Sequence, residues 1–178
     1  MLKRFWREFL VAAVVAALAF FAIDFLGDLV LQEPEELKIT ASIMVFSIAV
    51  IVVPGLVGGG IAGVLVGKRE KSLKARLFVP ALGAAIGTVA VMALGLGGIL
   101  FLTEAGWQAQ LDELGSIGVD FFAEMTLEEY KAMVLFSALF GMLFMALINF
   151  AIGLVGGYLG SMASGKEKNA RGNRKTKG

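Results

Sequence analysis

The segment from Pro54 to Lys68, PGLVGGGIAGVLVGK, carries a glycine at every fourth position: Gly55, Gly59, Gly63 and Gly67. On an α-helix this spacing puts the four glycines on nearly one face. In a soluble helix each glycine costs roughly 1 kcal/mol relative to alanine. Inside a bilayer the chain must stay helical to satisfy its backbone, and a row of glycines lets another helix approach closely. The spacing therefore predicts the packing face of a transmembrane helix.

Apolar residues dominate the whole chain. They make up 58% of it, and the mean hydropathy is +0.82, well above that of soluble proteins. Crossing a bilayer takes about 20 apolar residues. Four stretches are long enough, at about 9–31, 39–66, 77–102 and 132–162. We therefore predict an all-α integral membrane protein whose four transmembrane helices form one domain over 1–165.

Charged residues are segregated along the chain, although the formal net charge is only +1. Basic residues flank the first stretch on its N-terminal side and follow the second and fourth stretches: Lys3, Arg4, Arg7, Lys68, Arg69, Lys71, Lys74, Arg76 and the tail 166–178. The other two connections are mainly acidic. Because basic loops stay in the cytoplasm, we expect a multi-pass protein of the cell membrane with both termini inside. The tail lacks large apolar residues and is expected to be disordered.

The first stretch, 9–31, allows more than one interpretation. A basic start and an apolar run also fit a cleaved signal peptide, although the length of the run favours a membrane span. Asp24 and Asp28 lie one helical turn apart within it, and a carboxylate at membrane depth is costly unless it is protonated, paired or facing water. The pair is either a cation or proton site that opens outward or the end of a helix that emerges from the membrane near Asp24.

Small residues in the third and fourth stretches extend the packing pattern. The expected helix-packing positions there are Gly83, Gly87, Gly153, Gly157 and Ser161. Asn149 lies on the same row as Gly153 and near the middle of its span. We expect its amide to hydrogen-bond a neighbouring helix; the alternative is that Asn149 lines an ion path for which Pro54 is the hinge. Otherwise Pro54 is a fixed bend.

The segment from Thr103 to Met125 is the one sizeable connection between the predicted spans. Its apolar residues recur at helical spacing in two stripes, Trp107, Leu111 and Leu114, then Ile117, Phe121, Phe122 and Met125. This pattern predicts two short amphipathic helices on the outer membrane surface. The following Thr126-Leu-Glu-Glu129 matches a capping box, so the fourth long helix is expected to begin there.

The chain contains a candidate internal repeat. Gly55-Leu-Val-Gly-Gly59 recurs as Gly153-Leu-Val-Gly-Gly157, and each copy reaches a Gly-Lys pair at the same distance, at Gly67 and Gly165. The simplest account is a duplicated helical hairpin. Both halves would begin inside, which predicts a parallel repeat about a pseudo-twofold axis along the membrane normal.

These two glycine runs, 55–67 and 153–165, together with the number of spans, resemble small four-span, glycine-rich membrane proteins of unknown function found in archaea and bacteria. The resemblance covers most of the chain and implies no activity. Small multidrug transporters also have four spans and a carboxylate in the first. Here that carboxylate would be Asp24 or Asp28, which lie late in the span and are Asp rather than Glu, and the chain has an added outer segment.

Residue types exclude several chemistries. The chain has no Cys and no His, which rules out disulfides, Cys or His metal sites and Cys or His catalysis. Gly67-Lys68 lacks the Ser or Thr that follows in a phosphate-binding loop. No polar cluster lies within the spans, where a base and a nucleophile could converge. We expect no enzymatic activity, no cofactor and no metal.

Two functions remain. The first is a structural or accessory membrane protein that packs through glycine-rich faces, as a homo-oligomer or in a larger membrane complex. The alternative is a small cation- or proton-coupled transporter or channel that uses Asp24, Asp28 and Asn149. The expected partners are membrane lipids, including anionic headgroups at Lys68–Arg76 and at the C-terminal tail, and no specific nucleic acid.

Overall fold

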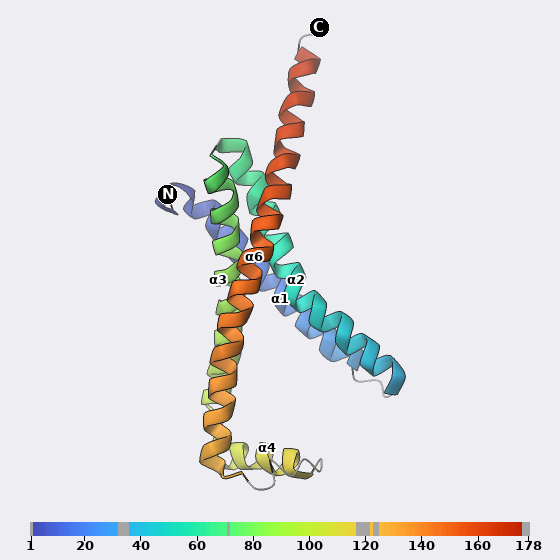
Figure 1. The fold of residues 1–178 in the computed structure, drawn as a ribbon, viewed down its shortest axis with the longest axis vertical. Helices are drawn as coiled ribbons and strands as arrows, with labels where there is room; N and C mark the ends of the chain where they lie inside the picture. Colours follow the sequence, from blue (N-terminus) through green and yellow to red (C-terminus); the bar gives the residue numbers. More distant parts are fainter. Residues whose placement is uncertain (1, 32–35, 71, 117–121, 123–124, 176–178) are drawn as a thin grey trace. The chain divides into compact units, whose positions relative to one another are not determined.

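The computed structural model describes residues 2–31, 36–70, 72–116, 122 and 125–175, with side chains over 4–26, 47–70, 72–116, 122 and 125–164. The elements are a short 3-10 helix, η1 (Leu2–Phe5), and the α-helices α1 (Trp6–Leu31), α2 (Glu36–Arg69), α3 (Leu73–Leu100), α4 (Glu104–Ser116) and α6 (Leu127–Lys175), shown in Figure 1. These residues form no strand. The all-helical class predicted from the sequence is confirmed for them.

Among the described residues, four helices are long and apolar enough to cross a membrane, over Trp6–Leu26, Ser47–Arg69, Leu73–Leu100 and Leu127–Ser164. Their number agrees with the four predicted spans. Many large side chains on these helices are exposed, for example Leu18 and Phe21, each at 63%. Such surfaces suit a lipid solvent and would not suit water. Four apolar helices therefore support a multi-pass membrane protein.

The boundaries differ from the sequence prediction in two places. Residues 166–175, predicted to be disordered, continue α6 as helix through Lys175; Lys, Glu, Ala and Arg are good helix formers and Pro is absent. The chain also divides into two compact units, 1–91 with 145–178, and 92–144, where one domain was predicted. We call these the first and second unit.

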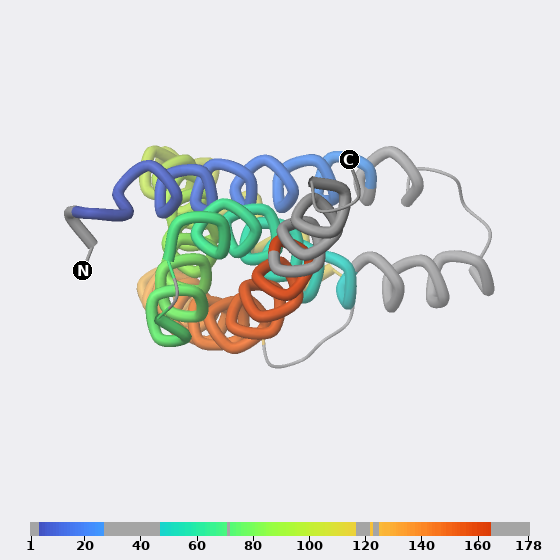
Figure 2. The backbone as a smooth tube through the Cα atoms, turned by 90° about the horizontal axis from the view of Figure 1, so that it is seen from above, coloured from blue at the N-terminus to red at the C-terminus, as the bar shows by residue number. Residues whose placement is uncertain are grey.

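The first unit contains α1, α2, the beginning of α3 and the C-terminal part of α6. Helices α1 and α2 lie side by side (Figures 1 and 2). A cluster of buried apolar side chains joins η1, the start of α1, the end of α2 and the start of α3: Phe5, Phe9, Val66, Ala75 and Val79. Pro54 and Pro80 are also buried, and their helices continue through them.

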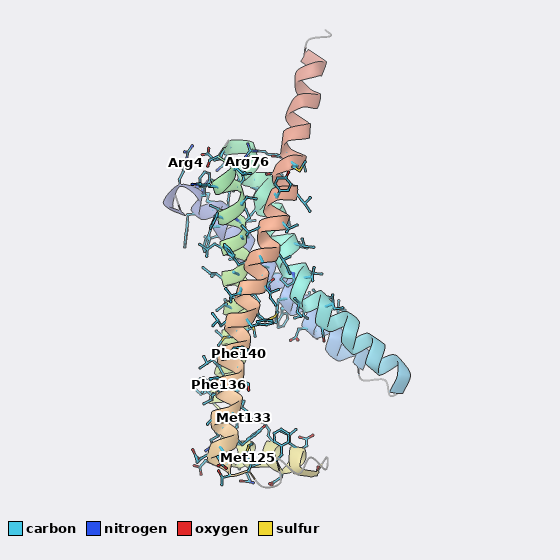
Figure 3. The ribbon with its side chains drawn as sticks, viewed as in Figure 1. Arg4, Arg76, Met125, Met133, Phe136 and Phe140 are labelled. Carbon is cyan, nitrogen blue, oxygen red and sulfur yellow. The ribbon has the colours of Figure 1, made fainter. Side chains whose placement is uncertain are left out.

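The second unit is built around α4. Trp107 and Leu111 on α4 form a buried cluster with Tyr130 on α6. The rings of Trp107 and Tyr130 meet edge to face, with their centroids 5.9 Å apart. Met125 and Met133 pack against the same cluster (Figure 3). The first predicted amphipathic helix is therefore present as α4. The second stripe lies mostly outside the described residues.

The predicted capping box is confirmed at the start of α6. The backbone N–H of Thr126 donates to Glu129 Oε2 at 2.9 Å. In return, the backbone N–H of Glu129 donates to Thr126 Oγ1 at 3.3 Å. The helix begins at Leu127, directly after the cap. A pattern of four residues thus fixes where the longest helix of the chain starts.

Thr126→Ala is expected to destabilise the second unit by about 1 kcal/mol, because it removes an N-cap acceptor from α6. Hydrogen exchange of the amides at the start of α6, measured in detergent, would show faster exchange in the variant. Gln110→Ala on the exposed face of α4 is the control. Equal exchange in Thr126→Ala and in the unmodified protein would contradict the capping role.

Candidate helix-packing seam

The glycine row of α2 lies against α6 in the first unit. A Cβ added at Gly59 would be 2.6 Å from the carbonyl oxygen of Gly153, and one added at Gly63 would be 2.5 Å from that of Gly157. Real Cβ atoms essentially never approach backbone so closely. The two backbones are therefore in direct contact at these positions. We call the α2–α6 contact the seam.

The ends of the same row also meet α6. A Cβ at Gly55 would be 3.0 Å from the Ile152 side chain and 3.1 Å from the carbonyl oxygen of Asn149. A Cβ at Gly67 would meet the Ser164 hydroxyl and lie 3.0 Å from Ser161 Cα. The structure thus places Gly55, Gly59, Gly63 and Gly67 along one helix–helix contact.

The predicted glycines of α6 and α3 lie at two further contacts of the first unit. A Cβ at Gly153 would be 2.8 Å from Ala81 Cα of α3, and one at Gly157 would be 2.9 Å from the Arg76 carbonyl oxygen. Gly83 of α3 faces α1, where an added Cβ would be 2.6 Å from the Phe9 carbonyl oxygen. Gly87 meets Ala13 of α1 in the same way. Small residues therefore bring α6 close to both α2 and α3.

Three further glycines, which were not predicted from the sequence, also lie at close contacts between helices. Gly58 faces α1, with an added Cβ 2.7 Å from the Ala12 carbonyl oxygen, and Gly156 faces α2, with its Cβ 2.7 Å from the Leu56 carbonyl oxygen. Gly160 meets the Gly60 carbonyl oxygen. The available signal was the doubled glycines in GLVGG, because adjacent glycines on a helix open two neighbouring faces rather than one.

The sequence repeat makes Gly59 equivalent to Gly157 and Gly58 equivalent to Gly156. In the seam Gly59 meets Gly153, four residues from the repeat register, whereas Gly156 meets Leu56, two residues from it in the opposite direction. The contacts therefore define no single displacement of α6 from a pseudo-twofold arrangement. The duplication itself stays a prediction.

Asn149 is fully buried at 0% exposure. Its Nδ2 donates to the Met145 carbonyl oxygen of its own helix at 3.1 Å. Its Oδ1 has no hydrogen-bond partner among the described residues. The predicted hydrogen bond from Asn149 to a neighbouring helix is therefore wrong, because the amide returns to the preceding turn of α6, as short polar side chains often do in helices.

The carboxylate proposed for an ion site is not part of this interior. Asp24 is exposed, and Asp28 lies outside the residues whose side chains are described. The Asn149 amide N–H donates to Met145 and not to Asp24. The structure therefore does not bring Asp24 and Asn149 together in one closed site.

Other candidate sites in the described chain are limited. No group of three or more acidic residues among the described residues could hold a metal ion. A shallow depression of about 330 Å³ lies in the second unit, lined by Gln108, Leu111, Asp112, Gly115, Ser116, Phe122 and Met125. Gln108 Nε2 donates to Asp112 Oδ1 there at 2.8 Å. These groups lie one turn apart on α4 and stabilise that helix.

Two acidic residues in the basic regions were not singled out from the sequence. Glu8 is buried at 4% exposure and accepts from Arg69 at 2.7 Å. Glu70 pairs with Arg4 at 3.3 Å. In the sequence each of these glutamates lies among basic residues. The local net charge is therefore positive and gives no sign of a paired carboxylate.

Comparison of the chain with known protein families, with characterised proteins and with solved structures finds no match.

Gly59→Ala is expected to destabilise the first unit by about 1–3 kcal/mol, because its Cβ meets backbone that has to move. The matched control is Gly97→Ala on α3, where an added Cβ has no atom within 4 Å; this change is neutral or slightly stabilising through helix propensity. Thermal unfolding in detergent compares the two. Equal stability of both variants would show that the seam is not tightly packed.

Asn149→Leu is expected to stabilise the first unit by about 1–3 kcal/mol, since it replaces a buried, unpaired carbonyl with an apolar group of similar size. Asn149→Ala is the control, because it removes the same carbonyl but leaves a cavity. The same unfolding measurement applies. A loss of stability in Asn149→Leu would mean that Oδ1 has a partner in the membrane.

Proposed function

We propose that the chain is a non-enzymatic, multi-pass protein of the cell membrane with a structural or accessory role, and that both termini lie inside. Its glycine-rich helix faces hold the protein together, and it works as a homo-oligomer or as a subunit of a larger membrane complex. The C-terminal tail and the loop around Lys68–Arg76 meet anionic lipid at the inner surface. No cofactor takes part.

The chemistry of the helix contacts is the observation that carries this proposal. Where helices of the first unit meet, the closest atoms are backbone and small side chains. Buried polar side chains on α3 and α6 hydrogen-bond within their own helix: Thr88 to Ala84, Asn149 to Met145, Ser161 to Tyr158 and Ser164 to Ser161. Polar groups that bond in this way do not converge on a shared substrate position.

The glycine faces described above are occupied within the chain, so a partner would meet other surfaces. Large apolar side chains of the spans provide such surfaces, among them Phe136 at 72% exposure on α6, which stacks on Phe140 (Figure 3). In a membrane such faces contact lipid or a second membrane protein. Exposed apolar faces of this kind are sufficient for an accessory protein that binds a second membrane protein.

A transporter or channel is the second candidate, and one observation favours it. Asn149 Oδ1 is buried without a partner among the described residues, and unpaired polar groups at membrane depth are often functional. In this alternative Asp24 and Asp28 receive the cation or proton, and Asn149 lines the path further in.

Flux measurement in proteoliposomes separates the two functions. The purified protein is reconstituted, and movement of protons and of monovalent cations is followed by fluorescent dyes. The proposal predicts the same flux from the unmodified protein, from Asp24→Asn and from empty liposomes. Flux above the empty liposomes that falls at least tenfold in Asp24→Asn would contradict the structural role and support transport.

A further inference from the structure

Basic side chains gather at one end of the first unit, where α1 begins, α2 ends and α3 begins. They are Arg4, Arg7, Lys68, Arg69, Lys74 and Arg76, and we call this region the basic end. Figure 3 shows Arg4 and Arg76 together there. Such a concentration of positive charge at the ends of apolar helices attracts anions.

Two carboxylates are set among these cations. Glu8 lies behind Arg69, at 4% exposure, and accepts from its guanidinium at 2.7 Å. Glu70 contacts Arg4 at 3.3 Å and accepts from the backbone N–H of Ser72 at 3.0 Å. The Glu70 carbonyl oxygen accepts from Arg76 Nε at 2.6 Å. These contacts join α1 to α2 through Glu8 and Arg69, and they join η1 and α3 to Glu70, so that the three arginines are held in place.

The held arginines remain open to a further ligand. The side chains of Arg4 and Arg69 are 73% and 65% exposed while each is paired with a glutamate. A guanidinium has five N–H donors, and Nη1 contacts the carboxylate in both Arg4 and Arg69. Arginine groups fixed on one side and exposed on the other suit a phosphate, which accepts from two N–H groups at once.

The neighbouring side chains indicate where that phosphate comes from. Trp6 is 55% exposed and stacks on Phe9 with ring centroids 5.5 Å apart. Leu73 and Phe78 at the start of α3 are 58% and 51% exposed. Exposed tryptophan beside arginine is typical of the boundary between headgroups and acyl chains. A phospholipid offers both the phosphate and the acyl chains that such a surface requires.

We propose that the basic end is a binding site for anionic phospholipid, in which Arg4 and Arg69 contact the headgroup phosphate and Glu8 and Glu70 position the two arginines. The lipid therefore binds at defined side chains and not only through the net charge of the loop. This inference rests on the proposed membrane location, but it is independent of whether the protein is structural or transports ions.

Native mass spectrometry of the detergent-solubilised protein tests the site, with phosphatidylglycerol and phosphatidylcholine added in parallel. The unmodified protein is expected to bind phosphatidylglycerol more tightly. Arg69→Gln should weaken that binding about fivefold, the equivalent of about 1 kcal/mol for one basic residue near a membrane surface. Lys131→Gln is the matched control, because Lys131 is also paired with a glutamate, Glu128 at 2.9 Å, but lies in the second unit.

Further variants and a competition measurement distinguish lipid binding at a defined site from general electrostatic attraction. Arg69→Lys keeps the positive charge but loses the bidentate guanidinium donor. Its affinity for phosphatidylglycerol should therefore lie between those of the unmodified protein and Arg69→Gln. Glu8→Ala removes the side chain that positions Arg69 and should weaken binding of phosphatidylglycerol; tighter binding, which the loss of a negative charge alone would give, would overturn the positioning role. Equal losses in Arg69→Gln and Lys131→Gln would overturn the proposal, as would equal binding of both lipids. Inorganic phosphate that competes at millimolar concentration would identify a phosphate site without lipid specificity and would also overturn it. Each of these results leaves the flux measurement unaffected, so the two proposals fail separately.

Discussion

Direct contact between the backbones of α2 and α6 is the interaction on which the first unit depends. In lipid, burial of apolar side chains gives little advantage, because the acyl chains are equally apolar. Helices then associate through dispersion contacts and weak polar contacts, which grow as the backbones approach. The pairs Gly59–Gly153 and Gly63–Gly157 allow that approach. Since the same stretch of α6 also meets Ala81 of α3, the seam sets the position of the third helix as well.

Polar side chains at the seam hydrogen-bond within their own helix and not across it. The Asn149 amide and the Ser164 hydroxyl bond to the backbone of α6, while the described ion pairs of the first unit, such as Glu8 with Arg69, lie at the basic end. Asn149 Oδ1 is the exception among the described residues. This separation explains why a chain with almost as many acidic as basic residues still presents four apolar helices.

Features set by local sequence could be predicted, and features set by packing geometry could not. The length of the apolar runs is enough to predict four spans, and Thr126 and Glu129 predict the start of α6, because both depend on neighbouring residues. Which residues of α2 and α6 meet across the seam depends on how ridges fit across two helices, which no local pattern specifies. The burial of Glu8 and the internal bond of Asn149 likewise depend on where α2 and α6 pass, so the candidate site was predicted in its small residues but not in its polar contacts.

Solid-state NMR of the protein in lipid bilayers, labelled with ¹³C only at glycine Cα, measures the seam most directly. The account predicts through-space cross-peaks between glycines of α2 and α6, assigned by their disappearance in Gly153→Ala and Gly157→Ala. Cross-peaks confined to glycines within one helix would contradict it.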